Sequence, residues 1–219
     1  MAVLRLTPIY EVYNTVGILS STVSITRFKV NGLLKKPVME TVEKGLKNNA
    51  IIEIDKTPYD KASGWTSFNS PFKPDFSGSS FVTGAYFVFS LRIDKKNIPS
   101  RMLKKFYSME IDKRLAETGR DFLTKTEKSA AKEHVVDLLN MRIPVTPNIY
   151  DLVWNYEDSD LWFFSNAKAA NEELETLFIK SFNITLLRLF PYTQSLLLSG
   201  LSDSEQDILH NLSLTKFLE

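Results

Sequence analysis

Few residues in this 219-residue sequence have the types and spacing that hydrolysis or phosphoryl transfer requires. The chain has no cysteine, no glycine-rich phosphate loop, no Gly-x-Ser-x-Gly elbow and no His-Glu-x-x-His pair. Its two histidines, His134 and His210, stand in separate predicted helices without a second ligand at a suitable spacing. A single histidine on a helix ordinarily has a structural role. We therefore expect a protein that is not an enzyme and holds no cofactor or metal.

Two pairs of acidic residues are the candidates for a metal site. Asp158 with Asp160, and Glu172 with Glu173, could provide the carboxylate oxygens that Mg²⁺ prefers. The first pair also suits a turn between strands, and the second suits the first turn of a helix, where negative charge complements the helix dipole. A metal-dependent exonuclease is therefore the alternative to a non-catalytic function.

Positive charge is concentrated in one segment, although the whole chain carries a formal net charge of only +1. Residues 92–132 contain twelve basic and six acidic residues, which leaves the rest of the chain at −5. Helical spacing places Arg101, Lys104, Lys105 and Ser108 on one face of a predicted helix, and Lys125, Lys128 and Lys132 on one face of the next. These two rows could contact the phosphates of a nucleic acid, or they could be ordinary solvated helix faces.

Composition points to an ordinary globular protein, with 43% hydrophobic and 24% charged residues. The lack of cysteine fits a reducing compartment, so the cytoplasm is the expected location. Residues 1–20 lack the basic start and unbroken apolar run of a signal peptide. No stretch approaches the roughly 18 apolar residues that a membrane-spanning helix needs.

Hydrophobic periodicity and turn residues predict alternating strands and helices. We expect strands at 24–30, 50–54, 64–68, 85–93, 149–155, 161–164 and 185–190. We expect helices that begin at Pro37, at Pro99, after Thr124, after a cap at Asn166, and after Ser202. Thr124 with Glu127, and Ser202 with Glu205, form capping boxes, and Gly119 ends the helix that begins at Pro99.

These elements predict an α+β fold: an antiparallel β-sheet with flanking helices and a protruding basic helical hairpin. The hairpin covers residues 99–142 and separates a first α+β portion, 1–98, from a second, 143–219, that packs with it. Both portions contain a strand–helix–strand order. Either a duplicated unit or the coincidence of common building blocks explains this order.

The aromatic run Leu161-Trp162-Phe163-Phe164 has two interpretations. Bulky apolar residues on a strand usually form the core of a sheet. The same residues could stack on the bases of a single-stranded nucleic acid.

Several segments, read in order, resemble the RdgC family of bacterial recombination-associated proteins. They are Ser24-Ile25-Thr26-Arg27-Phe28-Lys29-Val30, Gly64-Trp65, Tyr86 to Pro99, Leu115 to Lys132 with its Thr-Lys-Thr-Glu-Lys core, Tyr150 to Asn155, Leu161-Trp162-Phe163 and Ala167-Lys168-Ala169. The resemblance covers about residues 20–191, and it rests on the order and spacing of these segments rather than on one motif.

The resemblance implies a DNA-binding protein of the nucleoid that favours duplex DNA, has little sequence preference and modulates recombinase activity. It also implies a homodimer that closes around DNA with a positively charged inner surface. The phosphate contacts that it implies in this sequence are Lys95, Lys96, Arg101, Lys104, Lys105, Lys125, Lys128 and Lys132. Residues 192–219 match no part of the family pattern, and this chain ends earlier than longer members do.

The twofold contact of such a dimer could use the strands 85–93 and 161–164, if the sheet leaves one of their edges unpaired. A protein-interaction module without a nucleic-acid role is the third alternative. Basic residues scattered around an exposed apolar patch would favour it.

Overall fold

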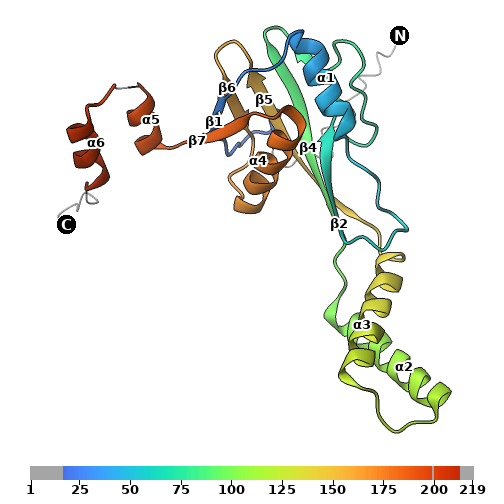
Figure 1. The fold of residues 1–219 in the computed structure, drawn as a ribbon. Helices are drawn as coiled ribbons and strands as arrows, with labels where there is room; N and C mark the ends of the chain where they lie inside the picture. The colour runs from blue at the N-terminus through green and yellow to red at the C-terminus, as the bar shows by residue number, and fades with distance from the viewer. Residues whose placement is uncertain (1–16, 199, 213–219) are drawn as a thin grey trace, which may run out of the picture.

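A computed structural model describes residues 17–198 and 200–212 of the chain. These residues form six helices and one seven-stranded sheet (Figure 1). In chain order the elements are β1 (Thr26–Asn31), α1 (Val38–Asn48), β2 (Lys61–Thr66), β3 (Val82–Thr83), β4 (Tyr86–Lys95), α2 (Ser100–Thr118), α3 (Lys125–Asn140), β5 (Thr146–Asn155), β6 (Asp160–Phe163), α4 (Lys168–Phe182), β7 (Thr185–Leu189), α5 (Pro191–Leu198) and α6 (Asp203–His210).

The strands form an antiparallel sheet in the order β2-β4-β5-β6-β1-β7, with β3 paired to β4 outside this path. The predicted α+β class is therefore confirmed. The two predicted α+β portions share this one sheet. Strand β4 pairs with β5 over ten residues, and β1 lies between β6 and β7.

The condition for a join between subunits through strands 85–93 and 161–164, an unpaired strand edge, is not met. Strand β4 is paired on both sides, by β2 and β5, and β6 is paired on both sides, by β5 and β1. Neither strand has a free edge on which a second subunit could add a strand. Strands β2 and β3 lie at one edge of the sheet, both paired with β4, and β7 lies at the other edge.

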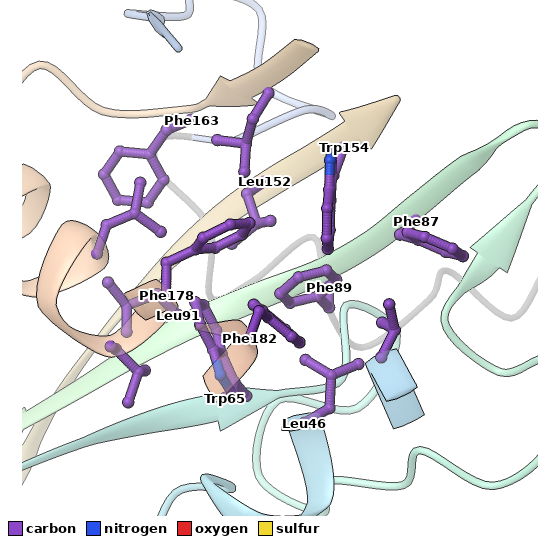
Figure 2. Close-up of a cluster of buried hydrophobic side chains, with 14 of the residues drawn as sticks. Leu46, Trp65, Phe87, Phe89, Leu91, Leu152, Trp154, Phe163, Phe178 and Phe182 are labelled. Carbon is purple, nitrogen blue, oxygen red and sulfur yellow. The ribbon is translucent and has the colours of Figure 1, made fainter. Parts of the chain in front are cut away.

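Helices α1 and α4 lie side by side against one face of the sheet and bury an aromatic core there (Figure 1). Trp65 of β2 and Trp154 of β5 are completely buried among rings from β4 and α4 (Figure 2). The ring centroids of Trp65 and Phe89 are 5.1 Å apart, and those of Trp154 and Phe178 are 5.0 Å apart, both edge-to-face. This geometry favours the interaction between the ring quadrupoles.

The helical hairpin of α2 and α3 projects from the end of the sheet where β4 ends and β5 begins (Figure 1). Gly119 follows α2 in the left-handed conformation, at φ 63°, which glycine adopts without a steric penalty. At the start of α3, Thr124 and Glu127 form both hydrogen bonds of a capping box. Both predicted helix boundaries are confirmed, as is the second capping box, Ser202 with Glu205 before α6.

Three local predictions differ from the structure. Residues 50–54 form no strand, because only Ala50 makes a bridge, to Trp65. The possible duplicated unit therefore lacks its second strand in the first portion. The residue that caps α4 is Ala167 rather than Asn166, and α5 was not predicted from the sequence. Among the described residues, none of the helices is long and apolar enough to cross a membrane.

Candidate nucleic-acid interface

Six of the eight predicted phosphate contacts fall into two basic rows on the hairpin. The α2 row comprises Arg101, Lys104 and Lys105, and the α3 row comprises Lys125, Lys128 and Lys132. All six side chains are exposed, and none forms an ion pair with any described carboxylate. Their positive charges are therefore available to a ligand.

Three other basic residues of the hairpin are engaged with neighbouring carboxylates. The pairs are Lys113 with Glu117 at 3.9 Å, Arg114 with Glu110 at 2.8 Å and Arg120 with Glu127 at 2.5 Å. The structure thus separates the basic residues of the hairpin into a neutralised set and an uncompensated set. The uncompensated set comprises the two basic rows and Arg142, which is exposed at the base of the hairpin and has no ion pair with a described carboxylate.

Helical periodicity places each row on one face of its own helix. Residues of both helices, among them Phe106 and Val135, line one groove between α2 and α3. Both rows reach the edge of this groove: the Lys105 ammonium group lies 5.9 Å from the ring centroid of Phe106, and Lys128 precedes Val135 by seven residues, about two helical turns.

The groove itself is mostly apolar and encloses a cavity of about 330 Å³. Phe106, Met109 and Val135 contribute to its lining, and Glu110 and Arg142 lie at its edges. Met109 is 55% exposed. The groove is not predicted from the sequence, because its lining combines side chains of two helices that become neighbours only when the hairpin packs.

Lys96 does not belong to the exposed basic surface, and this corrects its prediction as a phosphate contact. The residue is 7% exposed, and its ammonium group donates to the carbonyl oxygens of Ile54, Thr57 and Asn140 at 2.6, 2.8 and 2.7 Å. All three ammonium protons are thereby used inside the protein. Lys95, the preceding residue, points to the other face of β4 and is exposed.

Arg92 is a second basic residue whose charge is neutralised internally. Its guanidinium group donates to both carboxylate oxygens of Asp94, at 2.8 and 2.7 Å, and to Glu53 at 2.8 and 3.1 Å. Burial alone would lower the pKa of Arg92, but the hydrogen bonds to Asp94 and Glu53 outweigh it and raise the pKa. Burial raises the pKa of Asp94 in spite of the bonds from Arg92. Within residues 92–96 only Lys95 is therefore an exposed basic residue, and most of the positive charge of residues 92–132 is carried by the hairpin.

The acidic pairs considered for a metal site are engaged in structural contacts. Asp160 pairs with Lys29 at 3.1 Å, and Asp158 accepts a hydrogen bond from the amide of Asn155 at 2.7 Å. In the second pair, Glu172 lies 3.7 Å from Lys168, and Glu173 accepts hydrogen bonds from Lys61 and Ser63.

Burial alone would raise the pKa of Glu173, but the bonds from Lys61 and Ser63 outweigh it and lower the pKa. Within residues 17–198 and 200–212, no group of three or more potential ligands gathers at one point. His134 and His210 are exposed on α3 and α6.

The aromatic run in β6 divides between the two faces of the sheet. Leu161 and Phe163 are completely buried against α4 and the core, as their periodicity in a strand requires. Trp162 points to the opposite face and is partly exposed. The interpretation as sheet core is therefore correct for Leu161 and Phe163, whereas Trp162 lies outside the core.

The exposed basic rows of the hairpin can hold a polyanion by electrostatic attraction. No protein-family model and no curated protein matches this chain.

Proposed function

We propose that this protein binds duplex DNA without sequence specificity through the two basic rows of its helical hairpin. One observation carries the proposal: six exposed basic side chains form two rows on a projecting hairpin and have no carboxylate partner among the described residues. Lysine and arginine that neutralise phosphates release condensed counterions, and this release supplies affinity without reading bases. Lys95, exposed at the base of the hairpin, extends the surface toward the sheet.

The projection of the hairpin supports this ligand. The hairpin stands clear of the sheet (Figure 1), so both rows can approach a duplex without obstruction by α1 or α4. The two rows are also staggered along the hairpin, because the α2 row lies in the half nearer the sheet and Lys125 and Lys128 lie nearer the tip. A staggered set of charges suits the spaced phosphates of a backbone rather than a single small anion.

The resemblance to the RdgC family extends the proposal to cellular role. A protein of this kind would act in the cytoplasm on the nucleoid, and would modulate recombination by occupying the DNA on which a recombinase acts. No catalytic step belongs to this proposal. The carboxylates that a nuclease would need are held by Lys29, Lys61 and Lys168 instead.

The proposal includes a homodimer, because two copies of one basic surface arranged about a twofold axis hold a duplex longer than one copy does. Strand β7 is the available edge, since its outer side pairs with no described strand. Leu187 on this strand is 40% exposed. Light scattering at micromolar concentration should give twice the chain mass of 25.0 kDa. A strictly monomeric mass, both free and with DNA, would exclude the dimer.

A salt titration of binding to random-sequence duplex DNA tests the central proposal. Changing Lys104, Lys105, Lys128 and Lys132 to alanine should weaken binding to all sequences alike. It should also reduce the slope of log K against log salt by about 3 to 4, at about 0.9 per lost contact. Alanine is well tolerated at exposed helix positions, so the fold should persist.

The matched control removes the same number of charges elsewhere on the surface. It changes Lys35, Lys44, Lys73 and Lys180, which are exposed and unpaired among the described residues. This control should leave the salt slope within one contact of the wild-type value. Equal losses in the two variants, or a flat slope in the wild-type protein, would contradict the hairpin as the DNA surface.

A further inference from the structure

The second face of the sheet differs from the face that α1 and α4 cover. Its side chains come from the alternate positions of β1, β4, β5 and β6, and in the described residues no helix crosses its centre. Helix α5 only overhangs the edge of this face at β7. On the side of β2 and β4, by contrast, the polar residues Thr66, Ser90 and Arg92 are buried. On β5, Asp151 of this face is also buried, and its carboxylate accepts a hydrogen bond from the backbone of Ile18 at 3.2 Å. The accessible part of this face is therefore formed by β6, β1 and β7.

Two partly exposed aromatic rings lie side by side on this face of the sheet. Trp162 of β6 and Tyr86 of β4 are partly exposed, and their ring centroids are 6.0 Å apart with the ring planes inclined by 35°. Strand β5 lies between them, and Val153 of β5 is directly opposite Trp162. Partly exposed rings on the surface of a sheet offer flat π-faces to a further planar group.

A basic pocket adjoins the ring of Trp162. Arg27 of β1 is the direct cross-strand neighbour of Trp162, and neighbours in this position have Cβ atoms about 4.5–5.5 Å apart. Arg27 and Lys29 line a cavity of about 210 Å³ together with Asp160, Leu189, Gln194 and Leu197. This volume is below the roughly 300–1,000 Å³ of pockets for drug-sized ligands, so the cavity suits one small ring system.

The charges of this pocket do not cancel. Lys29 is neutralised by Asp160 at 3.1 Å and also donates to the carbonyl oxygen of Asp158 at 2.6 Å. Arg27 is exposed and forms no hydrogen bond or ion pair with a described residue. The pocket therefore keeps one net positive charge, on a guanidinium group beside an aromatic ring.

We propose that this Trp162–Arg27 surface binds single-stranded DNA by stacking an unpaired base and holding the adjacent phosphate. An indole face, a guanidinium plane and the amide of Gln194 form the combination that recognises splayed bases, through stacking and hydrogen bonds to base edges. The inference goes beyond the proposed function, because both the surface and the form of the nucleic acid differ from those of the hairpin. It also gives the molecule separate places for paired and unpaired strands.

Intrinsic fluorescence tests the stacking directly. The chain has three tryptophans, and Trp65 and Trp154 are 0% and 1% exposed, so Trp162 is the one that a ligand can reach. Titration with oligo(dT) of about 15 nucleotides, within the site sizes known for single-strand binding, should quench the fluorescence with saturation. The Trp162→Phe variant should show no quenching, while it retains a ring at this position and the fold.

Affinity measured by anisotropy of labelled oligo(dT) separates the contributions. Trp162→Ala should lower the affinity about 5- to 150-fold, the range for loss of one base-stacking contact. Trp162→Phe should retain most of the affinity, and Arg27→Gln should lower it together with the salt slope. Arg188→Gln is the matched control, because Arg188 is exposed on β7 but at a position of the opposite face, and it should bind as the wild-type protein does.

Failure of this inference is distinguishable from failure of the proposed function. The four-lysine hairpin variant should lose duplex binding and keep the saturating quench by oligo(dT). A wild-type protein that binds duplex DNA but shows no quench by oligo(dT) would overturn the inference alone. So would equal oligo(dT) affinity in the wild-type, Trp162→Ala and Arg27→Gln proteins. Quenching by oligo(dT) without duplex binding would overturn the hairpin proposal, while the proposal for the Trp162–Arg27 surface would stand.

Discussion

The ammonium group of Lys96 lies 2.7 Å from the carbonyl oxygen of Asn140, the last residue of α3. This contact connects the segment between β4 and α2, where the hairpin begins, to the end of α3, where the chain returns to the sheet. The side-chain amide of Asn140 donates to the carbonyl oxygen of Pro58 at 2.9 Å, so the same loop contacts both residues. The base of the hairpin is thus fastened to the body of the protein by a buried charge and an amide.

Replacement of Lys96 by methionine should lower the free energy of unfolding by about 2–3 kcal/mol, because it leaves buried carbonyl oxygens without their donor. Urea denaturation measures this change. The matched control is Lys95→Met at the neighbouring exposed position, which should change the stability by less than about 0.5 kcal/mol. Equal stability of the two variants would show that the buried contacts of Lys96 contribute nothing.

Protonation of Glu127 should loosen the start of α3 at low pH. Hydrogen bonds from Arg120 and from the backbone and hydroxyl of Thr124 lower the pKa of Glu127 from 4.5 to about 2. Since the folded pKa is the lower one, the contribution to stability is present above pH 4.5 and is lost as the pH falls toward 2.

Carbon NMR of the Glu127 carboxyl group measures its pKa, and the amide shifts of residues 124–128 report the helix start. In Glu127→Gln this part of the pH dependence should be absent. A Glu127 carboxyl that titrates near 4.5 would contradict the capping contacts.

Asp151 should make the protein less stable as its carboxyl group ionises. Burial raises the pKa of Asp151, although hydrogen bonds from Ser90 at 2.8 Å and from the backbone of Ile18 at 3.2 Å oppose the effect. A folded pKa above the unfolded one means that unfolding free energy falls as pH rises from the ordinary value of 3.8 through the raised value. Urea denaturation across this range should show the decline in the wild-type protein and a smaller one in Asp151→Asn.

DNA degradation should be undetectable in the presence of Mg²⁺ or Mn²⁺. A two-metal mechanism requires several carboxylates around the ions, and here Asp160 and Glu173 are bound to lysines. End-labelled duplex and single-stranded DNA, incubated with saturating protein, provide the measurement. Product release that disappears in an Asp158/Asp160 or a Glu172/Glu173 double variant would identify a nuclease instead.

The hairpin could be predicted in detail because its signals are local. Gly119 ends α2 through its own backbone conformation, and Thr124 starts α3 by contacts only three residues away. The segment 50–54 was mispredicted because strand formation depends on a partner edge. Here the partner edge is that of β2, and residues 49–51 form only two backbone hydrogen bonds with it, both at Trp65.

The roles of individual charges were less predictable, because they depend on distant residues. Lys95 and Lys96 have the same chemistry and adjacent positions, and only the alternation of β4 sends one outward and the other into a ring of carbonyls. Arg92 is neutralised by Glu53, which lies 39 positions earlier in the chain. The number of charges in a segment shows neither that Lys96 is buried nor that Arg92 is paired with Glu53.

The central position of β1 in the second half of the sheet has a consequence for folding kinetics. Thr26 pairs with Phe163 and Asn31 with Thr185, so these ladders join residues separated by more than half of the chain. Loop-closure entropy makes such pairings slow to form, whereas the contacts within the α2–α3 hairpin are local and form quickly. During synthesis, β1 must wait until β6 and β7 have been translated. We therefore expect the hairpin to gain structure early and the sheet to close only in the last stage, when β1 enters between its two partners.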